Sequence, residues 1–155
     1  MFNLNTNLDN TMKLRKKEPW KSAIEYSKEL NGLMINLLVS DIKNASEFVS
    51  KVIGASIIYQ DIDFLAAEGF GCKWCYHADH TYDKHPFYLN SNQNNLIRGL
   101  GLEIRLIGCD PDKAEKNAKR HDFIILSESQ NKPHGFRESY IKDHDGYCWV
   151  PSIKI

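Results

Sequence analysis

The sequence contains the same order of elements twice, and this internal repeat restricts the fold more than any other feature. In the first copy, the apolar run LMINLLVS (33–40) is typical of a buried strand, Asp41 is placed to cap the helix that follows, and Gly54 is placed to end it. In the second copy, LEIRLIGCD (102–110) is typical of a strand, and Pro111 stands at the first position of the next helix. Three short strand candidates follow each helix. The repeat therefore predicts an α/β (α+β) fold of two similar modules, each with one strand, one helix and three further strands.

A chain of 155 residues is long enough for one well-buried core, and the repeat divides it into regions. Its first 12 residues are polar and rich in Asn, as in a frayed terminus. A short helix is expected to begin near Pro19, with Trp20 and Ile24 on one side. The expected regions are an N-terminal extension at 1–32, modules at about 33–78 and 101–152, and a joining loop at 79–100, the last three within one domain of residues 33–152.

Charge and hydropathy exclude several classes of protein. The 20 Lys and Arg residues balance 20 Asp and Glu residues, so nothing indicates general attraction to nucleic acid or to an anionic membrane. No run approaches the roughly 20 apolar residues that span a bilayer. The first residues, MFNLNTNLDN, lack the basic start and apolar run of a secretory signal. The sequence therefore predicts a cytoplasmic protein with no nucleic-acid or membrane partner.

The four cysteines do not form the pattern of a disulfide framework or of a zinc site. Cys72 and Cys75 make a lone CxxC, whereas a zinc ribbon needs a second pair at similar spacing. Residues three apart in a strand point to opposite faces, so the two thiols do not converge if this segment is a strand. Cys109 and Cys148 stand alone. We therefore expect Cys72 and Cys75 to have structural roles.

The segment HADHTYDKHP concentrates polar side chains where a strand is expected to run into a loop. Three imidazoles and two carboxylates of this kind suit either a metal ion or general acid–base catalysis. The other interpretation is a hydrogen-bonded loop whose aspartates cap turns. The Asn-rich stretch that continues to Arg98 is long for a connection and indicates a lid or a dimer arm. The polar residues are His77, Asp79, His80, Asp83 and His85.

Several ordered segments together resemble the vicinal oxygen chelate superfamily, which includes glyoxalase I, extradiol dioxygenases, and fosfomycin and bleomycin resistance proteins. They are NLLVSD with a helix ending in IGA, then DPDKAEKNA, and finally PHGFRESYIKDHDGYCWV, whose DHDG is close to the family's DPDG turn. HADHTYDKHP is similar to a motif of one subgroup. The resemblance covers residues 33–152 and implies paired βαβββ modules that form a cup for a small molecule, in a homodimer. It also favours a role for Arg137, near His134 and Glu138 in PHGFRES, as an architectural pairing partner over a role as a catalyst.

The resemblance further implies four metal-ligand positions, usually His or Glu, on equivalent strands. Seven residues before the helix-capping aspartates stand Met34 and Glu103, and four residues after the last turn glycine stands Val150. The fourth position is Lys73, Cys75 or His77. A thioether and a valine do not suit a hard divalent ion, so the usual site looks dismantled. His77 and Glu103 remain the candidate ligands for Zn, Fe, Ni or Mn, and no cofactor is certain.

Strand alternation predicts which side chains line the cup if the helices cover the faces rich in large apolar groups. Trp74, Tyr76, Tyr147 and Trp149 then lie under the helices. Arg105 is a natural anchor for a carboxylate or phosphate, or it simply pairs with Glu103. The predicted lining, with His80 from the following loop, is Met34, Asn36, Cys75, His77, His80, Glu103, Arg105, Cys148 and Val150.

Two hypotheses about function follow. The first is a small-molecule binder of glyoxalase/bleomycin-resistance type, with its metal site largely lost, because the lining is mostly apolar. The second is an enzyme, a lyase or oxygenase that uses the His77-Asp79-His80 cluster with Glu103 for metal-dependent or acid–base chemistry. In both, His77 and Glu103 are expected to line one cavity, as catalytic or ligand-binding residues. Neither identifies the ligand.

Overall fold

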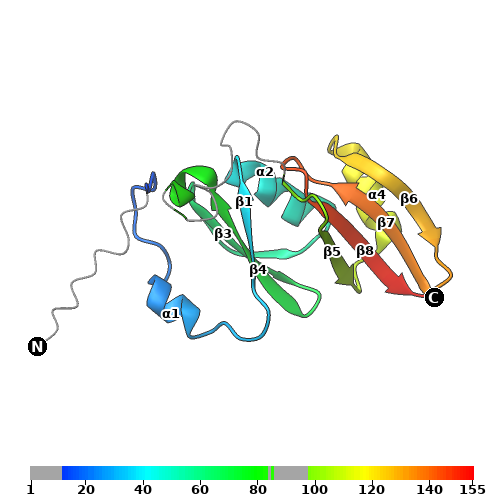
Figure 1. Cartoon of the computed structure of the whole chain (residues 1–155), viewed down its shortest axis with the longest axis horizontal. Coiled ribbons are helices and arrows are strands. Elements are labelled where there is room, and N and C mark those ends of the chain that lie inside the picture. The colour runs from blue at the N-terminus through cyan, green and yellow to red at the C-terminus, as the bar shows by residue number, and fades with distance from the viewer. Residues whose placement is uncertain (1–11, 84, 86–97) are drawn as a thin grey trace, which may run out of the picture.

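The computed structural model describes residues 12–83, 85 and 98–155, and it contains two four-stranded sheets, one from each predicted module (Figure 1). The predicted stretch between His85 and Arg98 and nearly all of the predicted frayed terminus lie outside the described residues. No helix among the described residues is long and apolar enough to cross a membrane.

The first module follows the predicted order of elements. Asp41 caps its helix, accepting a hydrogen bond of 2.6 Å from the Lys43 amide, and Gly54 follows with a φ of 68°. The sheet order is β1-β4-β3-β2, with β1 parallel to β4. The elements are β1 (Ile35–Val39), α2 (Ile42–Glu47), a π-helical turn η1 (Phe48–Val52), β2 (Ser56–Gln60), β3 (Phe64–Gly69), β4 (Cys72–Ala78) and a 3-10 turn η2 (Asp79–Tyr82).

The second module repeats this arrangement, so the predicted fold class is confirmed. Asp110 caps its helix and accepts hydrogen bonds from the amides of Asp112 (3.0 Å) and Lys113 (3.2 Å). The sheet order is β5-β8-β7-β6, with β5 parallel to β8, which matches the first sheet strand for strand. The elements are β5 (Glu103–Ile107), α4 (Pro111–Arg120), β6 (Ile124–Asn131), β7 (Phe136–Lys142) and β8 (Cys148–Lys154).

The helix-bearing faces of the two sheets share one hydrophobic core. Trp149 of the second sheet lies 5.9 Å from Trp74 of the first and 5.5 Å from Phe48 of η1, measured between ring centroids. Phe48 in turn meets Phe123, which follows α4, at 5.2 Å. Since residues from both sheets and both helices form this single cluster, the opposite face of each sheet points away from it. We call these opposite faces the first and second outward faces.

The N-terminal extension contains a five-residue helix, α1 (Ala23–Ser27), and packs against the first module (Figure 1). The helix begins after Ser22, which forms a capping box with Glu25, so the expected start near Pro19 is wrong. The expected apolar side is also wrong in part, because Ile24 is 70% exposed and Tyr26 is the buried residue. Trp20 precedes the helix and reaches the sheet from the preceding loop, so its contact does not follow helical spacing.

Candidate functional site

Strand alternation places the candidate residues on the two outward faces. Trp74, Tyr76 and Trp149 belong to the shared core, so their neighbours in the same strands face outward. In the first sheet, Cys75 is paired with Asn36. In the second, Val150 is paired with Arg105. The first outward face carries Asn36, Lys73, Cys75 and His77, and the second carries Glu103, Arg105, Cys148, Val150 and Glu138.

The middle of the first outward face is covered by the N-terminal extension. Cys75 is only 2% exposed and packs with Tyr26 and Ala66. The Tyr26 hydroxyl lies 3.4 Å from the Cys75 Sγ atom. Burial raises the pKa of the Cys75 thiol to about 11. Met34 packs at the border of the same cluster.

His77 lies at the end of this face, between two aromatic rings. Its imidazole is 4.9 Å from the ring of Phe64 and 5.0 Å from that of Tyr82, centroid to centroid. Burial, with a smaller effect from the charge of His85, lowers the pKa of His77 to about 4. The imidazole is therefore neutral at physiological pH and packs as an aromatic group.

The other polar residues of HADHTYDKHP turn to partners from distant parts of the chain. The Asp79 carboxylate accepts a 2.5 Å hydrogen bond from the Arg98 guanidinium. Arg98 also donates to Asp145 at 2.6 Å and to the Leu38 carbonyl at 3.3 Å, so it joins the ends of both modules. His80 Nε2 lies 2.8 Å from Oδ1 of the buried Asp63. These contacts fix the loop against β1, the β2–β3 turn and the last turn of the chain.

The second outward face has a polar centre built around a buried carboxylate. Glu138 is 0% exposed and forms an ion pair with Arg105, whose guanidinium also lies 3.5 Å from Glu103. The Tyr140 hydroxyl donates to Glu138 at 3.1 Å, and His134 Nε2 lies 3.5 Å from the same carboxylate. Burial alone would raise the pKa of Glu138, but the hydrogen bonds from Arg105 and Tyr140 outweigh it and hold this pKa below its usual value.

Sequence reasoning missed the Arg105–Glu138 pair. It proposed Glu103 as the partner of Arg105 because the two share one strand face, whereas Glu138 comes from β7, 33 residues further on. Arg137, the residue before Glu138, points to the helix-bearing face of the sheet. It binds Asp112 of α4 through two hydrogen bonds of 2.7 and 2.6 Å. Strand alternation along FRESYIK puts Arg137 and Glu138 on opposite faces of the sheet. This pattern was the available signal that Glu138, and not Arg137, shares a face with Arg105.

Exposed hydrophobic side chains surround this polar centre. On β5, Ile107 follows Arg105 on the same face and is 44% exposed. On β6, Ile124 is 52% exposed and is paired with Lys142 of β7. An apolar surface around a few fixed polar groups is the usual composition of a small-molecule site.

His77 and Glu103 lie in different sheets of one chain, and the expectation that they line one cavity stays a prediction. The shared core lies between the first and second outward faces, and no contact joins the two residues among those that the structure describes. Strand alternation places each side chain on its face. It does not determine how the two sheets pack, and here they pack through their helix-bearing faces.

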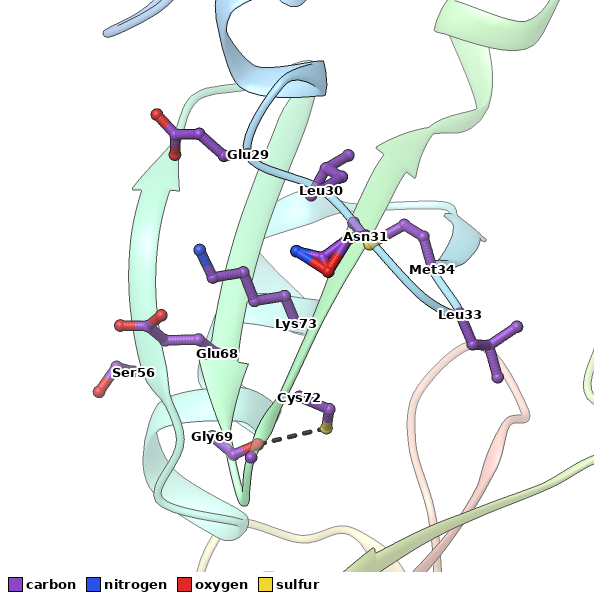
Figure 2. Close-up of a pocket in the computed structure, with 11 residues that line it drawn as sticks. Glu29, Leu30, Asn31, Leu33, Met34, Ser56, Glu68, Gly69, Cys72 and Lys73 are labelled. Carbon is purple, nitrogen blue, oxygen red and sulfur yellow. Dashed lines mark hydrogen bonds between the residues drawn. The ribbon is translucent and has the colours of Figure 1, made fainter.

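An open cavity of about 710 Å³ lies beside the covered part of the first outward face, between the end of α1 and the β3–β4 hairpin (Figure 2). The Lys73 side chain reaches into it and has no hydrogen bond or ion pair with any other described residue (Figure 2). The Cys72 thiol donates to the Gly69 carbonyl at 3.2 Å at its lower end. The N-terminal extension contributes Glu29, Leu30 and Asn31 to the wall of this cavity, and the sequence analysis did not expect the extension to line one. Side chains that line the cavity include Glu29, Leu30, Asn31, Met34, Glu68, Cys72 and Lys73.

The residues at the four implied ligand positions do not fit a divalent metal ion. Val150 has no donor atom, Met34 offers only a thioether, and His77 is packed between aromatic rings. Glu103 lies on the other outward face and is engaged with Arg105. Among residues 12–83, 85 and 98–155, no group of three or more His, Cys, Asp or Glu side chains is arranged to hold a metal ion.

Comparison with known proteins rests on structure, since no protein-family model and no curated protein matches the sequence. A glyoxalase-related enzyme from Fulvimarina pelagi superposes with a TM-score of 0.64 at 12% identity, covering 80% of this chain and 88% of that one. A glyoxalase/bleomycin resistance protein/dioxygenase family enzyme from Burkholderia phytofirmans gives 0.63 at 13%, covering 79% and 97%. TioX from Micromonospora gives 0.59 at 15%, covering 81% and 99%. The paired βαβββ modules of this chain therefore have the fold of the vicinal oxygen chelate superfamily, that of glyoxalase/bleomycin resistance/dioxygenase proteins.

Proposed function

We propose that this protein binds a small organic molecule, and that the second outward face is the centre of its binding surface. The observation that carries the proposal is the buried Glu138 carboxylate, held by Arg105 and Tyr140 on a face that is otherwise open. A carboxylate without solvent contact is costly unless it is paired, and its partners here fix the position of a guanidinium that is partly exposed. Preorganised polar groups of this kind orient a ligand at low entropic cost.

The charges on this face favour a neutral or cationic ligand. One guanidinium faces two carboxylates, those of Glu138 and Glu103, so the centre carries no excess positive charge. Both terminal nitrogens of Arg105 are already engaged. Its use as an anchor for a carboxylate or phosphate is therefore disfavoured. The exposed Ile107 and Ile124 add apolar contact area for the rest of the molecule.

A complete cup requires both outward faces, and we propose that a homodimer supplies them. Within one chain the two faces lie on opposite sides of the core, so the first outward face of one copy would have to meet the second outward face of another. The exposed Ile107 and Leu102 at the β5 edge are suited to such a contact. Light scattering tests this: a monomer at micromolar concentration contradicts it, whereas a dimer that Ile107→Glu dissociates supports it.

The enzyme hypothesis has less support from the contacts. Asp79 is bound by Arg98 and His80 by Asp63, so both side chains contribute contacts that hold the loop in place. His77 is held between Phe64 and Tyr82 with a pKa of about 4, far below the value that suits a general acid–base catalyst near neutral pH.

Thermal melting with a panel of neutral and cationic aromatic compounds and amines tests the binding function. A ligand that binds only the folded state raises the melting temperature. A compound that stabilises the wild type should stabilise Glu103→Ala much less, because Glu103 is a half-exposed side chain of the proposed surface. The control is Glu128→Ala, an exposed carboxylate that pairs with Lys119 of α4 instead. Equal shifts for both variants would place the ligand elsewhere.

A further inference from the structure

Residues 13–30, here called the strap, cross the first outward face without joining its sheet. Among the described residues, the two sheets are formed by strands β1 to β8, and the strap adds no strand to them. Its helix, α1, has five residues, too few to be stable in isolation. The strap is therefore held in place by side-chain contacts, and such a segment is released more easily than a sheet strand.

The first of these contacts is an anchor at the buried carboxylate of Asp63. Its Oδ1 accepts a 2.8 Å hydrogen bond from the Leu14 amide, and its Oδ2 accepts one of 3.2 Å from the Arg15 amide. The Arg15 guanidinium lies 3.6 Å from the same carboxylate, and His80 binds it from the other side at 2.8 Å. This anchor lies at the β2–β3 turn, apart from Cys75 in β4.

The second contact is aromatic and fills the middle of the face. The indole ring of Trp20 stacks on Tyr59 at 4.5 Å with an interplanar angle of 15°. Tyr26 lies 5.0 Å from Trp20 and 6.1 Å from Phe64, and its hydroxyl reaches Cys75. Two aromatic rings of the strap thus occupy the space above the strands.

The pseudo-symmetry of the modules explains why this space exists. Cys75 is paired with Asn36, as Val150 is paired with Arg105, so Cys75 and Val150 hold equivalent places. In the second module the neighbouring strand carries large side chains over this place, Tyr140 and Glu138. In the first module the neighbour of Cys75 is Ala66. Small residues leave a depression in the first outward face, and the strap fills it.

We propose that this depression is a binding subsite for an aromatic small molecule, and that Trp20 and Tyr26 occupy it until a ligand displaces them. This inference rests on the proposed small-molecule binding function and adds the chemistry of one part of the ligand. The rings that fill the depression are an indole and a phenol, stacked on Tyr59 and set against Phe64. A displacing ligand therefore offers a planar aromatic ring, with a hydroxyl able to meet the Cys75 sulfur.

Competition with the strap sets the apparent affinity. A ligand binds only the fraction of molecules whose strap is undocked, and its apparent Kd is the intrinsic Kd divided by that fraction. Weakening the strap raises this fraction without changing the sheet. The apparent affinity for aromatic compounds should therefore rise when strap contacts are removed, which is opposite to the effect of removing an ordinary binding residue.

Binding of indole and p-cresol to the full chain, measured by calorimetry, tests the proposal. The Trp20→Ala/Tyr26→Ala variant should bind at least about tenfold more tightly than the wild type, because its depression is no longer filled. Ile24→Ala is the matched control, since it changes an exposed residue on the same helix and should leave the affinity unchanged. Affinity that is equal or lower in the double variant, with its circular dichroism unchanged, would overturn the proposal.

Arg15→Ala keeps the test decisive if the double variant fails to fold. Arg15 contributes to the anchor at Asp63 and lies outside the depression, so its loss should free the strap and raise the affinity for indole while both rings remain. No gain in affinity would count against the subsite. Indole should also slow alkylation of Cys75 in these variants, which locates the binding. All of these changes leave Glu103 and Arg105 intact, so a negative result here is separate from a failure of the second outward face to bind a ligand.

Discussion

The two outward faces belong to modules with the same topology, yet their centres are covered in different ways. The first has small residues at its centre, Ala66 and Cys75, and is covered by a segment from outside the module. The second covers its own centre with Arg105, Glu138 and Tyr140 and is otherwise open. A duplicated backbone therefore does not produce a duplicated site. The side chains at equivalent positions decide whether a face carries its own polar centre or is filled by another segment of the chain.

The largest expected effect concerns the cover of the first face. Burial holds the pKa of Cys75 at about 11, two units above its reference of 9, which lowers the thiolate fraction at neutral pH by about 100-fold. Tyr26→Ala should therefore increase the rate of Cys75 alkylation by up to about 100-fold, as followed by mass spectrometry. The exposed Cys72 in the same chain is the internal control and should react at an unchanged rate. An unchanged rate at Cys75 would show that the strap does not shield this face.

The second face should be sensitive to the loss of its internal pair. Arg105→Leu leaves the buried Glu138 carboxylate without its cationic partner and should lower the free energy of unfolding by about 2 kcal/mol, as measured with urea. Arg137→Leu is the matched change in β7 of the same module, and it removes the pair with the exposed Asp112. That change should cost less than about 1 kcal/mol. Equal losses would mean that Glu138 is not a special feature of the second face.

The two faces should also differ in their response to pH. The folded-state pKa of His77 is about 4, below its reference of 6.5, so the unfolded chain binds the proton more readily between these values. Stability should fall by about 2.5 kcal/mol as pH decreases from 6.5 to 4, and His77→Asn should remove this part of the dependence. The pKa of Glu138 is also lowered, against the opposing effect of burial, by its bonds to Arg105 and Tyr140, so its contribution should be lost only below about pH 4.5. A wild-type pH profile in the variant would contradict the burial of His77.

The smallest difference is expected at the two helix caps. Asp110 accepts hydrogen bonds from two amides of the ten-residue α4, whereas Asp41 accepts one from an amide of the six-residue α2. Asp110→Ala should cost about 1 kcal/mol of stability and Asp41→Ala about 0.5 kcal/mol, measured by chemical denaturation. The reverse order would indicate that η1 makes the first helix more dependent on its cap than its length indicates.

The sequence predicted the parts of this fold that depend on local patterns. The capping aspartates, Gly54 and strand alternation located both modules and placed Trp74 and Trp149 in the core. Local patterns do not report partners far apart in the sequence. The strap was missed because Leu14 and Tyr26 bind residues 49 positions away, at Asp63 and Cys75.

The candidate site was less predictable for the same reason. The histidines and aspartates of HADHTYDKHP look like one cluster in the sequence, but Asp79 turns to Arg98 and His80 turns to Asp63. Glu138 is invisible as a partner of Arg105 until β7 is known to lie two strands from β5. The placement of His77 and Glu103 in one cavity stays a prediction, because alternation does not say which faces of two sheets pack together.

Arg98 has a consequence for how the molecule comes apart. Its guanidinium ties the Leu38 carbonyl and Asp79 of one module to Asp145 of the other, while Gly99 approaches the last turn so closely that a Cβ atom would lie 2.4 Å from the Gly146 carbonyl oxygen. Because these contacts and the shared core join the two modules, the modules are not independent folding units. The duplicated units should therefore melt in one transition, and neither half should persist as a stable fragment without the other.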